Sequence, residues 1–92
     1  MTPKFKRACA RAAKLTDENF TAAAMAALAA GLDTPEGDEL ERRAKACEEE
    51  HEKAGELTPS IKQQRDGIWR DLEREIRAAF GQHGVDHANK SL

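Results

Sequence analysis

The sequence predicts an all-α fold, a small bundle of about four helices followed by a frayed C-terminal tail. Apolar residues recur at intervals of three and four, the spacing that places them on one face of an α-helix. Strand signals are nearly absent, because the 92 residues include one valine, no tyrosine and no alternating run of β-branched residues. Three Thr-Pro pairs, beginning at Thr2, Thr34 and Thr58, combine a helix-capping residue with the proline favoured in a first helical turn.

The first two helices are predicted over residues 3–14 and 17–30. Either Thr16 or Asp17 is expected to cap the second helix, whose acidic first turn suits the positive end of a helix dipole. The rest of this helix is mainly alanine. Gly31 is expected to end it, because glycine readily adopts the left-handed conformation that closes many helices.

The third and fourth helices, predicted over residues 35–54 and 59–80, differ in character. The third is a charged rod with a narrow apolar seam, stabilised by pairs four residues apart: Glu39–Arg43, Glu41–Lys45 and Glu49–Lys53. The fourth is predicted to be the main core element and to continue across Gly67, because its wide apolar face stays in phase there. That face consists of Ile61, Ile68, Trp69, Leu72, Ile76, Ala79 and Phe80.

One domain is expected over residues 1–81, with a flexible tail over 82–92 where apolar periodicity is lost. Much of the apolar content is alanine, which adds little area to a core, so a homodimer is one expected way to bury more surface. No apolar run approaches the roughly 18 residues of a membrane span, and no membrane association is expected. Two cysteines without a secretion signal favour a reducing, cytoplasmic location.

Charge is sorted along the chain, although the net charge is only −2. The first fifteen residues hold five bases and no acid: Lys4, Lys6, Arg7, Arg11 and Lys14. Residues 36–56 hold nine acids against four bases. Such a sequence has one face suited to an anionic partner and another suited to a cationic one, unless the basic and acidic helices dock on each other.

Two pairs of potential zinc ligands occur at a spacing of four residues, Cys47 with His51 and His83 with His87. Side chains four apart share a helix face, so the pairs would offer four ligands to a tetrahedral site. The short Cys-rich knuckles of most structural zinc sites do not occur. In the simpler interpretation, Cys47 is a small apolar residue of the seam and the tail histidines lie in solvent.

An enzyme is not expected, and no cofactor is assigned. Three glutamates follow Cys47 and should raise its pKa, which would leave it a poor nucleophile. Cys9 lies among bases that favour a thiolate, but no histidine is near it in the sequence. The sequence contains no glycine-rich phosphate loop, nucleophile elbow or zinc-protease motif.

The sequence therefore predicts a non-enzymatic protein-interaction or regulatory protein, of the adaptor or small-inhibitor kind. Its acidic third helix is expected to meet another protein with a basic surface through Glu41, Glu48, Glu49, Glu50 and Glu52. The alternative is a nucleic-acid-binding regulator whose basic first helix contacts phosphates, which the acidic net charge disfavours. A zinc-stabilised helical module is the weaker alternative.

Overall fold

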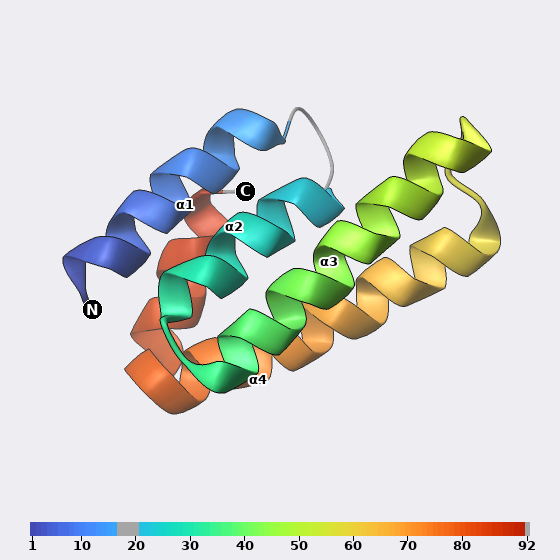
Figure 1. Cartoon of the computed structure of the whole chain (residues 1–92). Helices are drawn as coiled ribbons and strands as arrows, with labels where there is room; N and C mark the ends of the chain where they lie inside the picture. The colour runs from blue at the N-terminus through green and yellow to red at the C-terminus, as the bar shows by residue number, and fades with distance from the viewer. Residues whose placement is uncertain (17–20, 92) are drawn as a thin grey trace.

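The computed structural model describes residues 1–16 and 21–91, which form four α-helices and no strand. They are α1 (Pro3–Leu15), α2 (Ala22–Leu32), α3 (Pro35–Ala54) and α4 (Pro59–Ser91). Figure 1 shows α1, α2 and α3 side by side with alternating direction, while α4 returns along α3 and its last segment turns back behind α1. The predicted all-α bundle is confirmed.

Each helix begins at a threonine whose side-chain oxygen accepts a hydrogen bond from a backbone N–H three residues on. The pairs are Thr2 with Phe5 at 3.1 Å, Thr21 with Ala24 at 3.1 Å, Thr34 with Gly37 at 3.0 Å and Thr58 with Ile61 at 3.2 Å. Such a cap contributes about 1 kcal/mol to helix stability. The three predicted Thr-Pro starts are therefore confirmed.

The bounds of α2 differ from the prediction at both ends. The helix is capped by Thr21, whereas Thr16 lies at the C-terminal end of α1 and Asp17 lies outside the described residues. At the other end the left-handed residue is Asp33, with φ 55°, and Gly31 remains inside the helix. Gly31 serves packing instead, because a Cβ atom added there would lie 2.3 Å from the Ala8 Cβ of α1.

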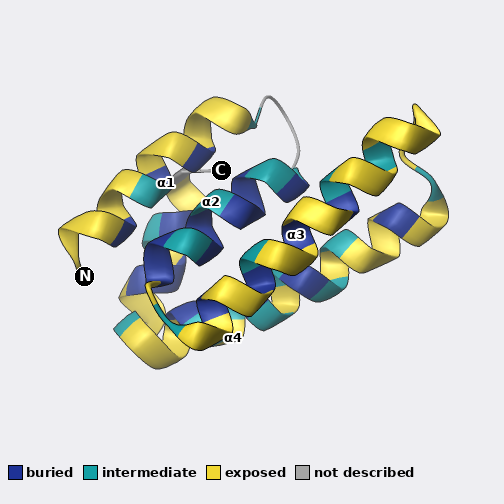
Figure 2. Ribbon diagram, in the orientation of Figure 1, coloured by how far each residue is buried: buried dark blue, intermediate teal, exposed yellow. Residues whose placement is uncertain are grey.

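The helix α2 lies at the centre of the packing, in contact with α1, α3 and α4, whereas α4 supplies more of the large buried side chains, in line with its predicted role in the core. Eight of the eleven residues of α2 are buried, including Met25 and Leu28. Figure 2 shows this burial along α2, in contrast to the exposed outer sides of α1 and α3. The face of α4 contributes four large residues, Ile61, Ile68, Leu72 and Ile76, whereas Trp69 and Phe80 are half-buried and Ala79 is exposed.

The fourth helix crosses Gly67 without interruption, as predicted, and its axis breaks at Gly81, where φ is 71° and ψ is −167°. The sequence placed the helix end at this glycine, but residues 82–91 form a further helical segment. Val85 and Ala88 of that segment are buried in the common core. The flexibility predicted for 82–92 stays a prediction, and Leu92 lies outside the described residues.

One further contact, between two aromatic rings, joins the first and last helices. The rings of Phe5 in α1 and Phe80 in α4 lie with centroids 4.7 Å apart and a tilt of 38°, close to the break at Gly81. Within the described ranges, no helix has the combined length and apolarity required to cross a bilayer.

Candidate interaction groove

A groove of about 470 Å³ runs along α2, between α1 and α3, and we call it the alanine groove. Its floor is formed by Ala23, Ala26, Ala27 and Ala30 of α2. One wall, from α3, consists of Glu41, Lys45, Glu48, Glu49 and Glu52. The opposite wall, from α1, consists of Arg11 and Leu15.

Helix geometry explains how these residues come together. The floor positions follow the spacing i, i+3, i+4, i+7, and the α3 wall follows i, i+4, i+7, i+8, i+11, so each set forms one stripe along its helix. At 1.5 Å per residue, the acidic wall from Glu41 to Glu52 is about 16 Å long. Because alanine side chains are short and those of both walls are long, α2 forms the bottom of a trough.

The α3 wall is strongly acidic in its C-terminal half. Near the other end, Lys45 forms an ion pair with Glu41 at 3.2 Å, which offsets one negative charge. Among the described residues, no ion pair joins Glu48, Glu49 or Glu52 to a base. The C-terminal end of a helix also carries a partial negative charge from its peptide dipoles, which adds to the negative potential there.

The α1 wall is basic and partly apolar. Leu15 is 43% exposed, and Arg11 is exposed beside it. A second hollow of about 320 Å³ continues from the alanine groove, sharing Arg11, Ala27 and Ala30 and adding Lys4 and Arg7. Lys4, Arg7 and Arg11 therefore follow one another along the two hollows. Among these three bases, only Lys4 has an acidic partner in the described part of the chain, Asp33 at 2.9 Å.

The structure gathers four of the five predicted interaction glutamates on one wall of the groove. The exception is Glu50, which lies on the α4 side of α3 and accepts a hydrogen bond from the Gln64 side chain at 3.1 Å. Of the five bases proposed for nucleic acid, Lys4, Arg7 and Arg11 line the two hollows. Lys6 and Lys14 are exposed on α1 but line neither hollow.

The acidic helix does not dock on the basic helix of its own chain. In the described residues no Cα atom of α1 lies within 8 Å of a Cα atom of α3, because α2 lies between them. The opposite charges that the sequence placed in these two helices thus face each other across a groove, and neither surface is covered by the other.

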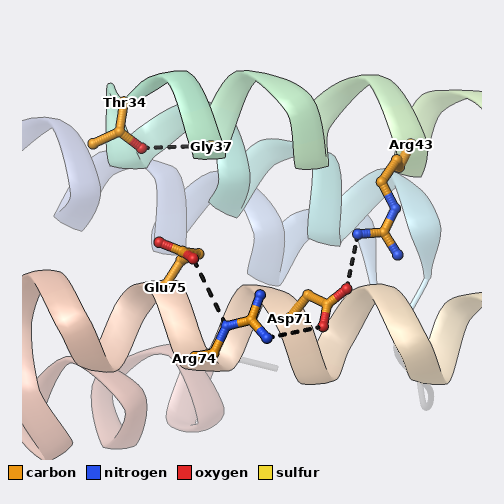
Figure 3. Close-up of polar contacts among 6 residues, drawn as sticks. All are labelled: Thr34, Gly37, Arg43, Asp71, Arg74 and Glu75. Atoms are coloured by element: carbon orange, nitrogen blue, oxygen red, sulfur yellow. Dashed lines mark hydrogen bonds and ion pairs between the residues drawn. The ribbon is translucent and has the colours of Figure 1, made fainter.

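On the face between α3 and α4, by contrast, acidic and basic side chains form ion pairs with one another (Figure 3). Arg43 reaches across to Asp71 at 2.8 Å instead of pairing with Glu39 in its own helix, and Arg74 lies 3.6 Å from the same carboxylate. The hydrogen bond from Arg43 is the main reason that the pKa of Asp71 lies below its ordinary value. Charges on this face therefore neutralise one another inside the fold.

Two other predicted intrahelical pairs have different outcomes. Glu41–Lys45 forms, as given above. Glu39, which was predicted to pair with Arg43, instead pairs with Arg42 at 2.6 Å. Over residues 1–16 and 21–91, no ion pair joins Glu49 to Lys53. Glu49 therefore keeps its charge available to the groove.

The candidate zinc ligands are not brought together. Within the ranges that the structure describes, no group of three or more His, Cys, Asp or Glu side chains has an arrangement suited to a metal ion. Cys47 and Cys9 are both buried thiols. Burial is the largest cause that raises the pKa of the Cys47 thiol; Arg65 opposes the rise, and Glu50 and Glu48 add to it, as the sequence predicted for the neighbouring glutamates.

Comparisons with known protein families, with curated proteins and with solved structures found no match. The groove and its charges are therefore the basis for a functional proposal. Its walls were visible in the sequence as charged segments, but its floor was missed. The four alanines do have helical spacing, yet every residue from Ala22 to Leu32 is apolar or glycine, so no single stripe of that helix stands out.

Proposed function

We propose that this protein is a non-enzymatic interaction or regulatory protein that binds a partner protein with a basic surface in the alanine groove. The observation that carries the proposal is the position of Glu48, Glu49 and Glu52. These exposed or half-buried glutamates follow one side of an apolar floor and have no basic partner in the described part of the chain. A cationic partner would supply that missing charge.

The shape of the groove supports a macromolecular partner. It is an open trough in which small apolar side chains are flanked by long charged ones, an arrangement typical of an interface with an apolar centre and a polar rim. Short floor side chains let another backbone approach closely. The charges of the rim would speed encounter and select the partner more than they add affinity.

A charge-reversal pair tests this function. The groove variant Glu49→Lys/Glu52→Lys changes the acidic wall. The control Glu50→Lys/Glu56→Lys makes the same change of charge outside the groove, near the end of α3 and just after it. Immobilised wild type and both variants are used to capture proteins from a host lysate, and bound proteins are quantified by mass spectrometry. A partner retained by wild type and control should be lost from the groove variant by about tenfold or more, or about 1.4 kcal/mol.

Equal capture by all three proteins would overturn the proposal. All four substituted glutamates are exposed, so the helical circular dichroism signal should stay unchanged in both variants. Lysines near the C-terminal end of α3 also suit the helix dipole, which favours folding of the groove variant.

A second candidate function is nucleic-acid binding through α1. Lys6, Arg7, Arg11 and Lys14 are exposed and have no acidic partner among the described residues, so they are free to contact phosphates. Wild type should then retard duplex or single-stranded DNA on a gel at low salt, and Lys6→Glu/Arg7→Glu/Arg11→Glu should abolish the shift. Absence of retardation by wild type would remove this candidate, which the facing acidic wall already disfavours by repulsion of phosphate.

A further inference from the structure

The two walls of the alanine groove carry opposite charge. A bound partner must therefore match a positive wall as well as a negative one, and a basic surface alone would match only the negative wall. We propose that the groove binds one amphipathic helix of a partner protein, with basic residues along one flank and acidic residues along the other. This inference rests on the proposed function and adds the chemistry and the direction of the bound segment.

The floor favours a helix with small or medium apolar residues on its contact face. Helices pack at interaxial distances of about 8–10 Å, and the lower end of that range requires small side chains at the contact. The floor supplies alanine only, in a stripe with helical spacing. A partner stripe at i, i+3, i+4, i+7 would lie along it, as in other complexes where a helix fills a groove.

The length of the groove sets the length of the segment. An acidic wall of about 16 Å corresponds to about eleven helical residues, or three turns. Contacts would begin near Leu15 and Ala23, where the exposed leucine offers apolar area at the rim.

The charges set the sides of the helix. Its basic flank would face Glu48, Glu49 and Glu52, and its acidic flank would face Arg11, with Arg7 farther along α1. A helix rotated end for end in the groove exchanges its two flanks. The order of charge around the partner helix therefore determines whether it runs with α2 or against it.

Synthetic peptides test this arrangement directly. The segregated peptide has alanine and leucine on its contact face, lysine on one flank and glutamate on the other. A side-chain crosslink on the outer face holds it helical, because a helix this short is marginal in water. The mixed peptide has the same composition with lysine and glutamate alternating on both flanks. A third peptide carries lysine on both flanks.

Fluorescence anisotropy should show the segregated peptide binding wild type about tenfold or more tightly than either other peptide. Arg11→Glu should weaken the segregated peptide and strengthen the peptide with two lysine flanks. Glu49→Lys/Glu52→Lys should weaken both, and the control Glu50→Lys/Glu56→Lys should change neither.

Direction gives an independent readout. Two segregated peptides that differ only by exchange of their flanks are labelled with a nitroxide at the N-terminus. One label should broaden amide resonances near Ala23 and the other those near Ala30. Broadening at the same end by both peptides would overturn the inference, as would binding of the mixed peptide as tight as that of the segregated one.

Failures of the two proposals are distinguishable. If the peptide with two lysine flanks binds as tightly as the segregated peptide, the groove recognises positive charge alone, so the proposed function stands and the charge-sided helix is wrong. If no peptide binds and wild type instead sediments as a dimer that Glu49→Lys/Glu52→Lys dissociates, the occupant is a second copy of this chain and the inference is overturned.

Discussion

The helices α2 and α3 pack against each other but are stabilised by opposite means. The first is apolar all round and made mainly of the smallest side chains, and eight of its eleven residues are buried. The second is charged on most of its surface and buries only Gly37 and a seam of Leu40, Ala44 and Cys47. Small side chains add little buried area individually, but they place α2 at the centre of the bundle because they let its neighbours come close.

Two glycines show how close these approaches are. A Cβ atom at Gly31 would meet the Ala8 Cβ at 2.3 Å, and one at Gly37 of α3 would meet the Ala29 carbonyl oxygen at 2.6 Å. Both contacts are made by α2, one with each wall helix. At the α3–α4 contact, the Ile61 backbone carbonyl accepts a hydrogen bond from the Cys47 thiol, and Arg43 forms an ion pair with Asp71.

The strongest test of a core centred on α2 is Leu28→Ala. This side chain is fully buried, so its loss should lower the free energy of unfolding by about 2–5 kcal/mol through lost apolar burial and a residual cavity. Urea unfolding followed by circular dichroism measures the change. Leu57→Ala, at a position 47% exposed, is the control and should stay within about 0.5 kcal/mol of wild type. Similar losses at both positions would contradict a centre in α2.

Close packing between α1 and α2 predicts that Gly31→Ala destabilises the protein by about 1–3 kcal/mol, because the new methyl group overlaps Ala8 and the helices must separate. Gly67→Ala is the matched control, since its Cβ would meet only the Arg70 side chain at 3.7 Å. There the better helix propensity of alanine should add up to about 1 kcal/mol. A stabilising Gly31→Ala would show that the contact is looser than described.

The segment after Gly81 can be compared with α2 by Val85→Ala. Val85 is buried in the same core, so removing two methyl-sized groups should cost about 1.5 kcal/mol of unfolding free energy. The measurement is again urea unfolding. An unchanged midpoint would mean that this segment contributes nothing to stability and behaves as the flexible tail that the sequence predicted.

The smallest effect on stability is expected for the exposed ion pair between α3 and α4. Arg43→Ala should cost about 0.5 kcal/mol at neutral pH, the usual size for a pair this exposed. Because the pKa of Asp71 is depressed in the folded state, the contribution is present above its ordinary value of 3.8 and is lost as the pH falls through the folded pKa. The difference between wild type and variant should therefore shrink in strongly acidic buffer. A pH-independent difference would point to lost packing of the arginine stem instead.

Local signals explain what the sequence predicted correctly. Three helix starts depend on a threonine followed by proline, and that chemistry acts within one turn. The start of α2 was misplaced because Thr16 and Thr21 satisfy the same capping pattern, and only packing decides between them. Gly31 looked like a helix end for a similar reason, although its lack of a side chain serves the contact with Ala8.

Which helices lie next to each other could not be predicted from the sequence, for a different physical reason. The burial of Val85 and Ala88 depends on the turn at Gly81, which brings them against residues distant in the sequence. The local spacing of apolar residues does not indicate such a turn. The same holds for the groove. Charges on α1 and α3 were evident, but whether they touch, or face each other across α2, depends on which helix lies between them.

The ring contact of Phe5 with Phe80 joins a helix made early in synthesis to a turn made late. Loop closure over such a separation is slow compared with formation of neighbouring helix pairs. The bundle therefore closes only when residues from its first helix and from the turn at Gly81 meet, and this non-local step should make it fold more slowly than a pair of neighbouring helices.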